Sequence, residues 1–156
     1  MAYDRPPTIG GLLIRRLTAI DDAVRDLLQA RNYATVCTLA KNGSIHAQPT
    51  WVDTDGTVVL LNSVGGRAWV RNLERDPRVT CTIINMANPH EFVEVRGRVI
   101  ERATDQAATD HIHRLAKKYL DLDEYPWLTP DEPRTLLRIA PERLIHMYPG
   151  DAILVE

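Results

Sequence analysis

The chain has 156 residues, enough for one domain with a sizeable hydrophobic core and too few for two. Its 19 Lys and Arg residues against 21 Asp and Glu leave a net charge of −2, which argues against a nucleic-acid partner. The sequence has no apolar run of about 18 residues and no signal-peptide pattern, so we expect a cytoplasmic protein without a membrane contact.

Two prolines and two glycines fall within residues 1–17, and we therefore expect an N-terminal arm that is extended or mobile. The predicted domain covers residues 18–156. A helix is expected to begin with Thr18 as its capping residue and to end near Arg31. Its apolar positions fall on one helical face: Ile20, Val24, Leu27 and Leu28.

A β-hairpin is expected next. A strand over 33–39 leads to Lys41-Asn42-Gly43-Ser44, and its Asn-Gly pair is typical of a type I′ turn. The returning strand over 45–53 contains Pro49, which has no N–H to donate. This proline therefore marks a bulge, a sheet edge or a backbone segment that faces a ligand.

After a turn over 54–56, the pattern predicts an apolar strand over 58–61 that is buried on both faces. Gly65-Gly66 end this strand, and a short helix is expected over 67–75. Further strands are expected over these segments: 79–84, 91–102, 136–139 and 144–147.

A second amphipathic helix is expected to begin with Thr104 as its cap and to lie across one end of the sheet. The loop that follows, 121–133, contains three prolines and is therefore too stiff for a flexible linker. Within it, Trp127 either lines a pocket or only covers the end of the sheet.

Other reactive side chains give little indication of a site. Cys37 and Cys81 lie in apolar strand-like runs, so we expect buried, unpaired thiols. His111 and His113 are two residues apart on a helix and cannot share a face, which argues against a metal site. No nucleophile elbow or triad order supports hydrolase chemistry.

The segment from Asn62 to Arg78 concentrates groups that bind anions. Hydroxyl, glycine backbone and guanidinium groups meet there at a strand-to-helix junction, where unpaired N–H groups and the helix dipole favour a phosphate. Arg67 and Arg71 are four residues apart and are expected to hold the same anion. The pattern fits equally a glycine turn and a solvated helix with no ligand.

The order of several motifs resembles the pyridoxamine-phosphate-oxidase-like flavin and deazaflavin oxidoreductases, over roughly residues 20–148. The most specific string runs from Arg71-Asn72-Leu73 to Asp76-Pro77-Arg78-Val79. The other motifs are the Asn-Gly hairpin, Gln48-Pro49-Thr50-Trp51, Gly65-Gly66-Arg67 and Arg96-Gly97-Arg98-Val99.

The resemblance implies a six- or seven-stranded antiparallel split β-barrel with two or three helices, working as a homodimer with two equivalent cofactor sites. It implies that the cofactor ring lies against the second strand and the phosphate near the third strand and the helix after it. The ring neighbours are then Gln48, Pro49, Thr50 and Trp51. The residues around the phosphate are Asn62, Ser63, Gly65, Gly66, Arg67, Trp69 and Arg71.

One departure from the family pattern concerns the second cation. Many relatives that bind the deazaflavin coenzyme F-420 carry a lysine two residues after the arginine, where this chain has Trp69. Either Arg71 supplies the second positive charge, or the phosphate is held less tightly. No catalytic residue is evident. The candidates for a proton donor are His46, His146 and Tyr148, of which the last two are implied to approach the partner subunit's cofactor.

The predicted function is hydride transfer from reduced F-420 to a conjugated or electron-poor small molecule. Such a cofactor supplies the reaction chemistry, so the lack of an acid–base pair is no objection. The first alternative is an FMN-dependent enzyme of the same fold. The second is a protein that binds flavin or haem without catalysis.

Overall fold

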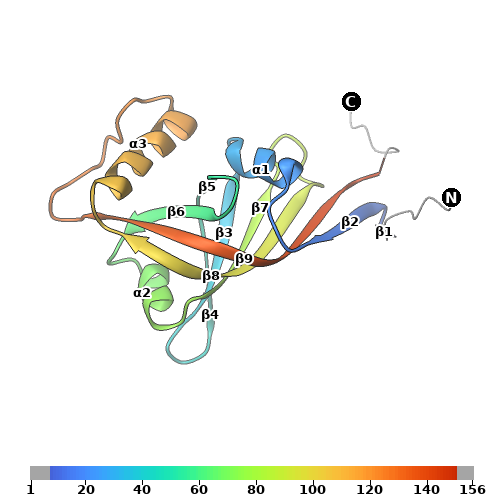
Figure 1. Ribbon diagram of the computed structural model, residues 1–156, viewed down its shortest axis with the longest axis horizontal. Helices are drawn as coiled ribbons and strands as arrows, with labels where there is room; N and C mark the ends of the chain where they lie inside the picture. The colour runs from blue at the N-terminus through green and yellow to red at the C-terminus, as the bar shows by residue number, and fades with distance from the viewer. Residues whose placement is uncertain (1–7, 151–156) are drawn as a thin grey trace.

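The computed structural model describes residues 8–150, and in that range nine antiparallel strands form one sheet with three helices beside it (Figure 1). The strands are β1 (Thr8–Ile9), β2 (Leu12–Leu17), β3 (Tyr33–Leu39), β4 (Ile45–Trp51), β5 (Asp53–Thr54), β6 (Val59–Val64), β7 (Arg78–Ile84), β8 (Phe92–Ala103) and β9 (Arg134–Pro149). The helices are α1 (Asp22–Gln29), α2 (Ala68–Arg75) and α3 (Gln106–Leu120).

The long strand β9 organises the sheet. One of its edges pairs with β8, while the other pairs first with β6 and then, after a bend, with β2. The full order is β1-β2-β9-β8-β7-β3-β4, with β5 attached to β6. No ladder joins β4 to β6 within the described part of the chain, so the barrel is split there. This is the mainly antiparallel split barrel with three helices that the resemblance implied. It has nine strands in residues 8–150 where six or seven were expected, because two short strands, β1 and β5, add to the seven longer ones.

The N-terminal prediction was wrong where the structure can be compared with it. An irregular arm was expected over residues 1–17, but β2 pairs with the second half of β9 along its whole length, from Leu12↔Pro149 to Leu17↔Leu144. Residues 1–7 lie outside the described part. The free edge of β9 explains the difference, because its unpaired backbone groups require a partner strand.

The predicted helix caps were also wrong. Asp21, not Thr18, caps α1 by accepting a hydrogen bond from the Val24 N–H at 3.0 Å. Asp105, not Thr104, caps α3 through the Ala107 N–H at 3.1 Å. In both cases a carboxylate stands nearer the helix than the threonine, and a charged acceptor there also interacts favourably with the helix dipole.

The final two predicted strands are one continuous strand. Pro141 lies between them and stands opposite Gly97 of β8, next to a shift in the register of the two strands. A proline is tolerated at such a bulge because no ladder hydrogen bond from its nitrogen is needed.

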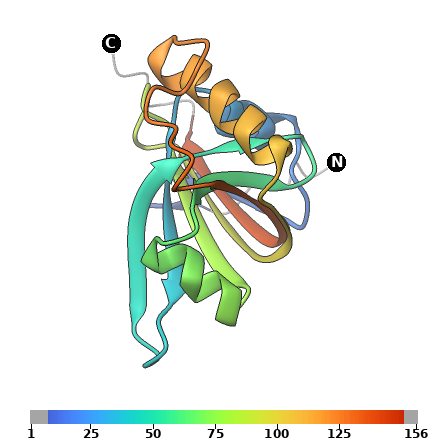
Figure 2. The same cartoon turned by 90° about the vertical axis from the view of Figure 1, so that its left-hand side faces the viewer.

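The core lies between the sheet and helices α1 and α2. Figure 2 shows α2 and α3 at opposite ends of the sheet. Helix α3 lies at the same end as α1, to which Lys118 joins it by donating to the Leu28 carbonyl, and it contributes two smaller apolar clusters. As predicted, β6 is buried on both faces. Cys81 is buried, and its burial raises the pKa of the thiol to about 12, whereas Cys37 is only half-buried. None of the helices in residues 8–150 is both long and apolar enough to cross a membrane.

Gly97 permits the close crossing of β8 and β9. A Cβ atom added to this residue would stand 2.1 Å from the carbonyl oxygen of Ala140, which is backbone and cannot move aside. We expect Gly97→Ala to lower the free energy of unfolding by about 1–3 kcal/mol or more, the range for overpacked sites. Urea unfolding measures this. Gly66→Ala is the matched control, because a Cβ there meets no atom within 4 Å; equal stability of the two variants would contradict the prediction.

Candidate functional site

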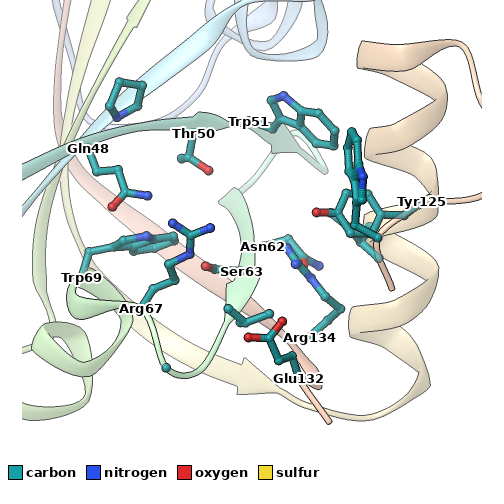
Figure 3. A pocket seen from close by; sticks show the side chains of 15 residues that line it. Gln48, Thr50, Trp51, Asn62, Ser63, Arg67, Trp69, Tyr125, Glu132 and Arg134 are labelled. Atoms are coloured by element: carbon teal, nitrogen blue, oxygen red, sulfur yellow. The ribbon is translucent and has the colours of Figure 1, made fainter. Parts of the chain in front are cut away.

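A cavity of about 620 Å³ lies where β4 and β6 separate (Figure 3). The stiff loop between α3 and β9 forms its outer wall. Its lining residues come from β4, β6, α2, α3, this loop and the start of β9: Gln48, Pro49, Thr50, Trp51, Asn62, Ser63, Val64, Gly66, Arg67, Trp69, Ile112, Tyr125, Trp127, Glu132 and Arg134. The split in the barrel therefore opens into a cavity large enough for a small-molecule ligand.

The β4 wall of the cavity carries a fixed aromatic side chain. Trp51 stacks on Tyr119 of α3, with ring centroids 4.9 Å apart and planes 5° from parallel. The Tyr119 hydroxyl accepts a hydrogen bond from the Val52 N–H at 3.1 Å and donates one to the Asn32 carbonyl. These bonds hold Tyr119, and the stacking in turn holds Trp51.

Two further aromatic residues extend this wall along the loop. Tyr125 meets Trp51 edge-on, with centroids 6.1 Å apart, and Trp127 meets Tyr125 in the same way at 5.5 Å. The backbone N–H of Tyr125 donates to Nδ1 of His113 at 2.9 Å, which anchors the loop to α3. The cavity thus has an apolar, aromatic side that suits a flat ring.

The opposite side of the cavity is the N-terminus of α2. Arg67 is the capping residue, and its side chain accepts no hydrogen bond from the first turn. The first-turn N–H groups therefore lack a side-chain acceptor at the positive end of the helix dipole. Gly66 lines the cavity beside Arg67, and a Cβ there would meet nothing within 4 Å, so the backbone is open to a ligand.

Two arginines reach into the cavity, Arg67 from α2 and Arg134 from the start of β9 (Figure 3). Arg134 is half-buried, with its guanidinium 5.1 Å from the centre of the Tyr125 ring. Burial lowers the pKa of Arg134, and the nearby positive charge of Arg67 lowers it further. Within residues 8–150, neither arginine forms an ion pair with a carboxylate.

Asn62 connects Arg134 to a buried histidine. Its Oδ1 accepts a hydrogen bond from Nε of Arg134 at 2.8 Å. Its Nδ2 donates to the Ala108 carbonyl at 2.9 Å and lies 3.2 Å from Nδ1 of His111. His111 is fully buried, and its Nε2 lies 3.7 Å from Oδ2 of Asp53.

Most of the cofactor residues predicted from the sequence come together in this cavity, with two exceptions. Gly65 lies beside the lining without being part of it. Arg71 differs more, because its guanidinium turns back and donates to the Gly66 carbonyl at 2.6 Å. The arginine that accompanies Arg67 in the lining is Arg134.

The three candidate proton donors do not line the cavity of their own chain. His46 lies on β4 opposite Thr38. His146 is buried between Glu91, whose Oε1 is 2.8 Å from its Nε2, and Arg15, whose Nη1 is 3.1 Å from its Nδ1. Tyr148 packs beside His146. Their role toward a partner subunit's cofactor stays a prediction.

Sequence reasoning missed several lining residues: Val64, Ile112, Tyr125, Glu132 and Arg134. The dense prolines of loop 121–133 were the available signal, since they hold Tyr125 and Trp127 at fixed places. Nothing in the local sequence distinguishes Arg134 from other strand arginines. Across residues 8–150, no cluster of three or more His, Cys, Asp or Glu is arranged to hold a metal ion.

Comparisons with known proteins identify the family to which this chain belongs. A model of the pyridoxamine 5′-phosphate oxidase family matches residues 20–148, whereas no curated protein matches the chain. Among solved structures, an F-420 reductase is 23% identical, with a TM-score of 0.69 over 77% of this chain and 94% of that one.

Two further solved structures share the fold at lower identity. The conserved hypothetical protein Rv2991 from Mycobacterium tuberculosis is 20% identical, with a TM-score of 0.61 over 81% of this chain and 84% of its own. General Stress Protein 26 from Bacillus anthracis is 16% identical, with a TM-score of 0.59 over 80% and 91%. Since the family model covers most of the chain and the split barrel agrees with it, the protein belongs to the pyridoxamine 5′-phosphate oxidase family of flavin-related proteins.

Proposed function

We propose that the cavity binds the deazaflavin coenzyme F-420 and that the protein transfers hydride from it to a conjugated or electron-poor small molecule. The observation that carries this proposal is that one cavity combines an aromatic wall with two arginines that form no ion pair with a carboxylate in residues 8–150. A cofactor with a flat ring and an anionic tail matches both features at once.

The ring side is suited to hold a planar heterocycle. β4 is an edge strand that pairs only with β3, so half of its backbone groups have no ladder partner. Pro49 adds no N–H of its own, while Gln48 and Thr50 bring polar side chains to the same wall. Trp51, held by its stack on Tyr119, fixes the depth to which a ring can enter.

The phosphate side combines a helix N-terminus with charge. Arg67 supplies a guanidinium, Ser63 a hydroxyl and Gly66 a backbone that a phosphate can approach closely. In a cavity partly shielded from water, these groups bind an anion more strongly than they would on an open surface.

When bound, the cofactor supplies the hydride, and the protein orients it and limits the access of water. The residues of this chain hold the ring with one face toward the opening of the cavity. Tyr125 is the phenol that lines this opening. The proton that accompanies the hydride comes from solvent, from Tyr125 or from a partner subunit.

FMN is the second candidate. The solved F-420 reductase shares this fold and supports the deazaflavin, but the two arginines suit the doubly charged phosphate monoester of FMN equally well. Both cofactors place a similar ring and a phosphate in the cavity, so binding experiments must compare them directly.

We also propose a homodimer. The outer face of β3, β4 and β7 exposes apolar side chains, among them Tyr33, Ile45 and Ile84, of which Tyr33 and Ile84 are directly paired. Such a patch on a sheet face is typical of an interface. Light scattering at micromolar concentration should give the mass of two chains; a monomer that retains its cofactor would rule the dimer out.

Arg67→Ala should weaken the binding of F-420 or FMN by about 1.5–3 kcal/mol, the range for hydrogen bonds to charged groups. The phosphate-free analogues provide the test: riboflavin for FMN, and the F-420 precursor that lacks its phosphate. Their affinities should not change, since Arg67 is expected to contact only the anion. Fluorescence titration measures all four ligands.

Trp51→Leu is the matched contrast at the ring side. It should weaken the binding of ligands with and without phosphate by the same factor, because Trp51 is expected to contact only the ring, which all four ligands contain. Equal losses for Arg67→Ala across both kinds of ligand would show that Arg67 supports the fold of the cavity and does not hold the phosphate.

The choice of cofactor has a direct test. A deazaflavin carries carbon where flavin has N5, so its reduced form transfers hydride and reacts poorly with oxygen. The purified protein should take up F-420 in preference to FMN. With reduced F-420 under air, it should reduce an activated alkene or a quinone faster than the free coenzyme does, as stopped-flow absorbance would show. Uptake of FMN alone would favour the flavin enzyme, and binding without turnover on any acceptor would favour a binding protein.

A further inference from the structure

We propose that Arg134 is the second cation of the anion site and that the buried pair Asn62 and His111 positions it. This inference deepens the proposed function, on which it rests for the identity of the natural ligand. It assigns the role that the sequence offered to Arg71, whose guanidinium is occupied by the Gly66 carbonyl.

The hydrogen bonds of Asn62 show that this residue acts through Arg134. An amide side chain has two N–H donors, and here one donates to the Ala108 carbonyl while the other points to Nδ1 of His111. Neither remains for a phosphate. The Oδ1 atom accepts from Nε of Arg134 and repels an anion. Asn62 lines the cavity, but it serves as a positioning residue.

The Ala108 carbonyl and Nε–H of Arg134 determine which way this amide points. Exchanging the oxygen and nitrogen of Asn62 would place an N–H group against Nε–H of Arg134 and the oxygen against the Ala108 carbonyl. With the amide fixed in this way, Nδ1 of His111 faces an N–H donor and is the unprotonated nitrogen, while Nε2 faces Asp53. His111 therefore supports this orientation as an acceptor.

The consequence is a guanidinium whose Nε edge is fixed. Nε of Arg134 is held by Asn62, and the ring of Tyr125 lies 5.1 Å from the guanidinium carbon. Burial lowers the pKa of this guanidinium, although Tyr125 and Glu132 lie close enough to it to favour its charged form. Glu132 also lines the cavity, but it is exposed and makes no ion pair with Arg134 within residues 8–150.

Charge indicates the class of ligand. The positive charge of Arg67 is close enough to the half-buried Arg134 to lower its pKa further, and placing two positive charges in one cavity is unfavourable unless an anion joins them. A phosphate monoester with two negative charges, or a phosphate diester with a neighbouring carboxylate, matches two guanidinium groups.

Titration of the full chain with inorganic phosphate tests this without any ring. Calorimetry in a buffer free of other polyvalent anions should show binding to the unmodified protein. Arg134→Met should weaken it about tenfold or more, as expected for the loss of a charge-assisted hydrogen bond. Arg138→Met is the matched control: Arg138 is on the same strand but pairs with Asp55 and Glu101, so phosphate affinity should not change.

Two variants of His111 test its role in positioning Arg134. His111→Leu should weaken phosphate binding, whereas His111→Asn should largely keep it, because the asparagine oxygen takes the place of Nδ1. In the double variant with Arg134→Met, His111→Leu should cause no further loss, since the histidine acts only through Arg134. Thermal unfolding of each variant separates loss of binding from loss of fold.

Three results would overturn the proposal: no phosphate binding by the unmodified protein, unchanged affinity in Arg134→Met, or additive losses in the double variant. A different result would overturn the proposed function. If phosphate binds as described but neither F-420 nor FMN binds, the anion site stands and the cofactor assignment does not.

Discussion

The pairing of β9 with two different strands along one edge is the constraint on which the rest of the structure depends. Its first half holds β6 and its second half holds β2, so the sheet must bend between them, at the point where Gly97 lets β8 pass close to Ala140. Because β6 is bound to β9 and β4 only to β3, the two strands separate. The cavity is the space that this separation leaves, with α2 and the loop before β9 closing its sides.

The walls of this cavity differ in polarity and charge. At one side, stacked aromatic rings and an edge strand present an apolar surface with a few polar groups. Facing this surface, Arg67 stands at the N-terminus of α2, while Arg134 lies against Tyr125 at the edge of the aromatic surface, and neither guanidinium forms an ion pair with a carboxylate among residues 8–150. Arg134 is half-buried whereas Arg67 is exposed, so under the proposed function a bound anion would mainly offset the cost of burying Arg134.

The sequence predicted the hairpin, the buried third strand, the helix after Gly65-Gly66 and most residues of the cavity, because local periodicity and turn chemistry determine these features. It failed where distant segments decide the outcome. Leu12–Leu17 becomes a strand only because β9 offers a free edge. Arg134 reaches the site through pairing with β6, and Arg71 leaves it because the Gly66 carbonyl is nearer. Thr18 and Thr104 do not cap their helices, because Asp21 and Asp105 stand nearer the first turn, and spacing alone does not show which residue will be the cap.

The separation of Asn62 and Arg134 along the chain, 72 residues, has a consequence for how the protein folds. Of the cavity walls, only the β4 part of the aromatic wall and the glycine turn lie close together in sequence. Arg134 joins them only after the closing of a much longer loop, which costs more entropy and is slower. Under the proposed anion site, a partly folded chain would present only Arg67 to a phosphate and gain Arg134 when β9 docks. Ligand that requires both binds the native state selectively and shifts the folding equilibrium toward it.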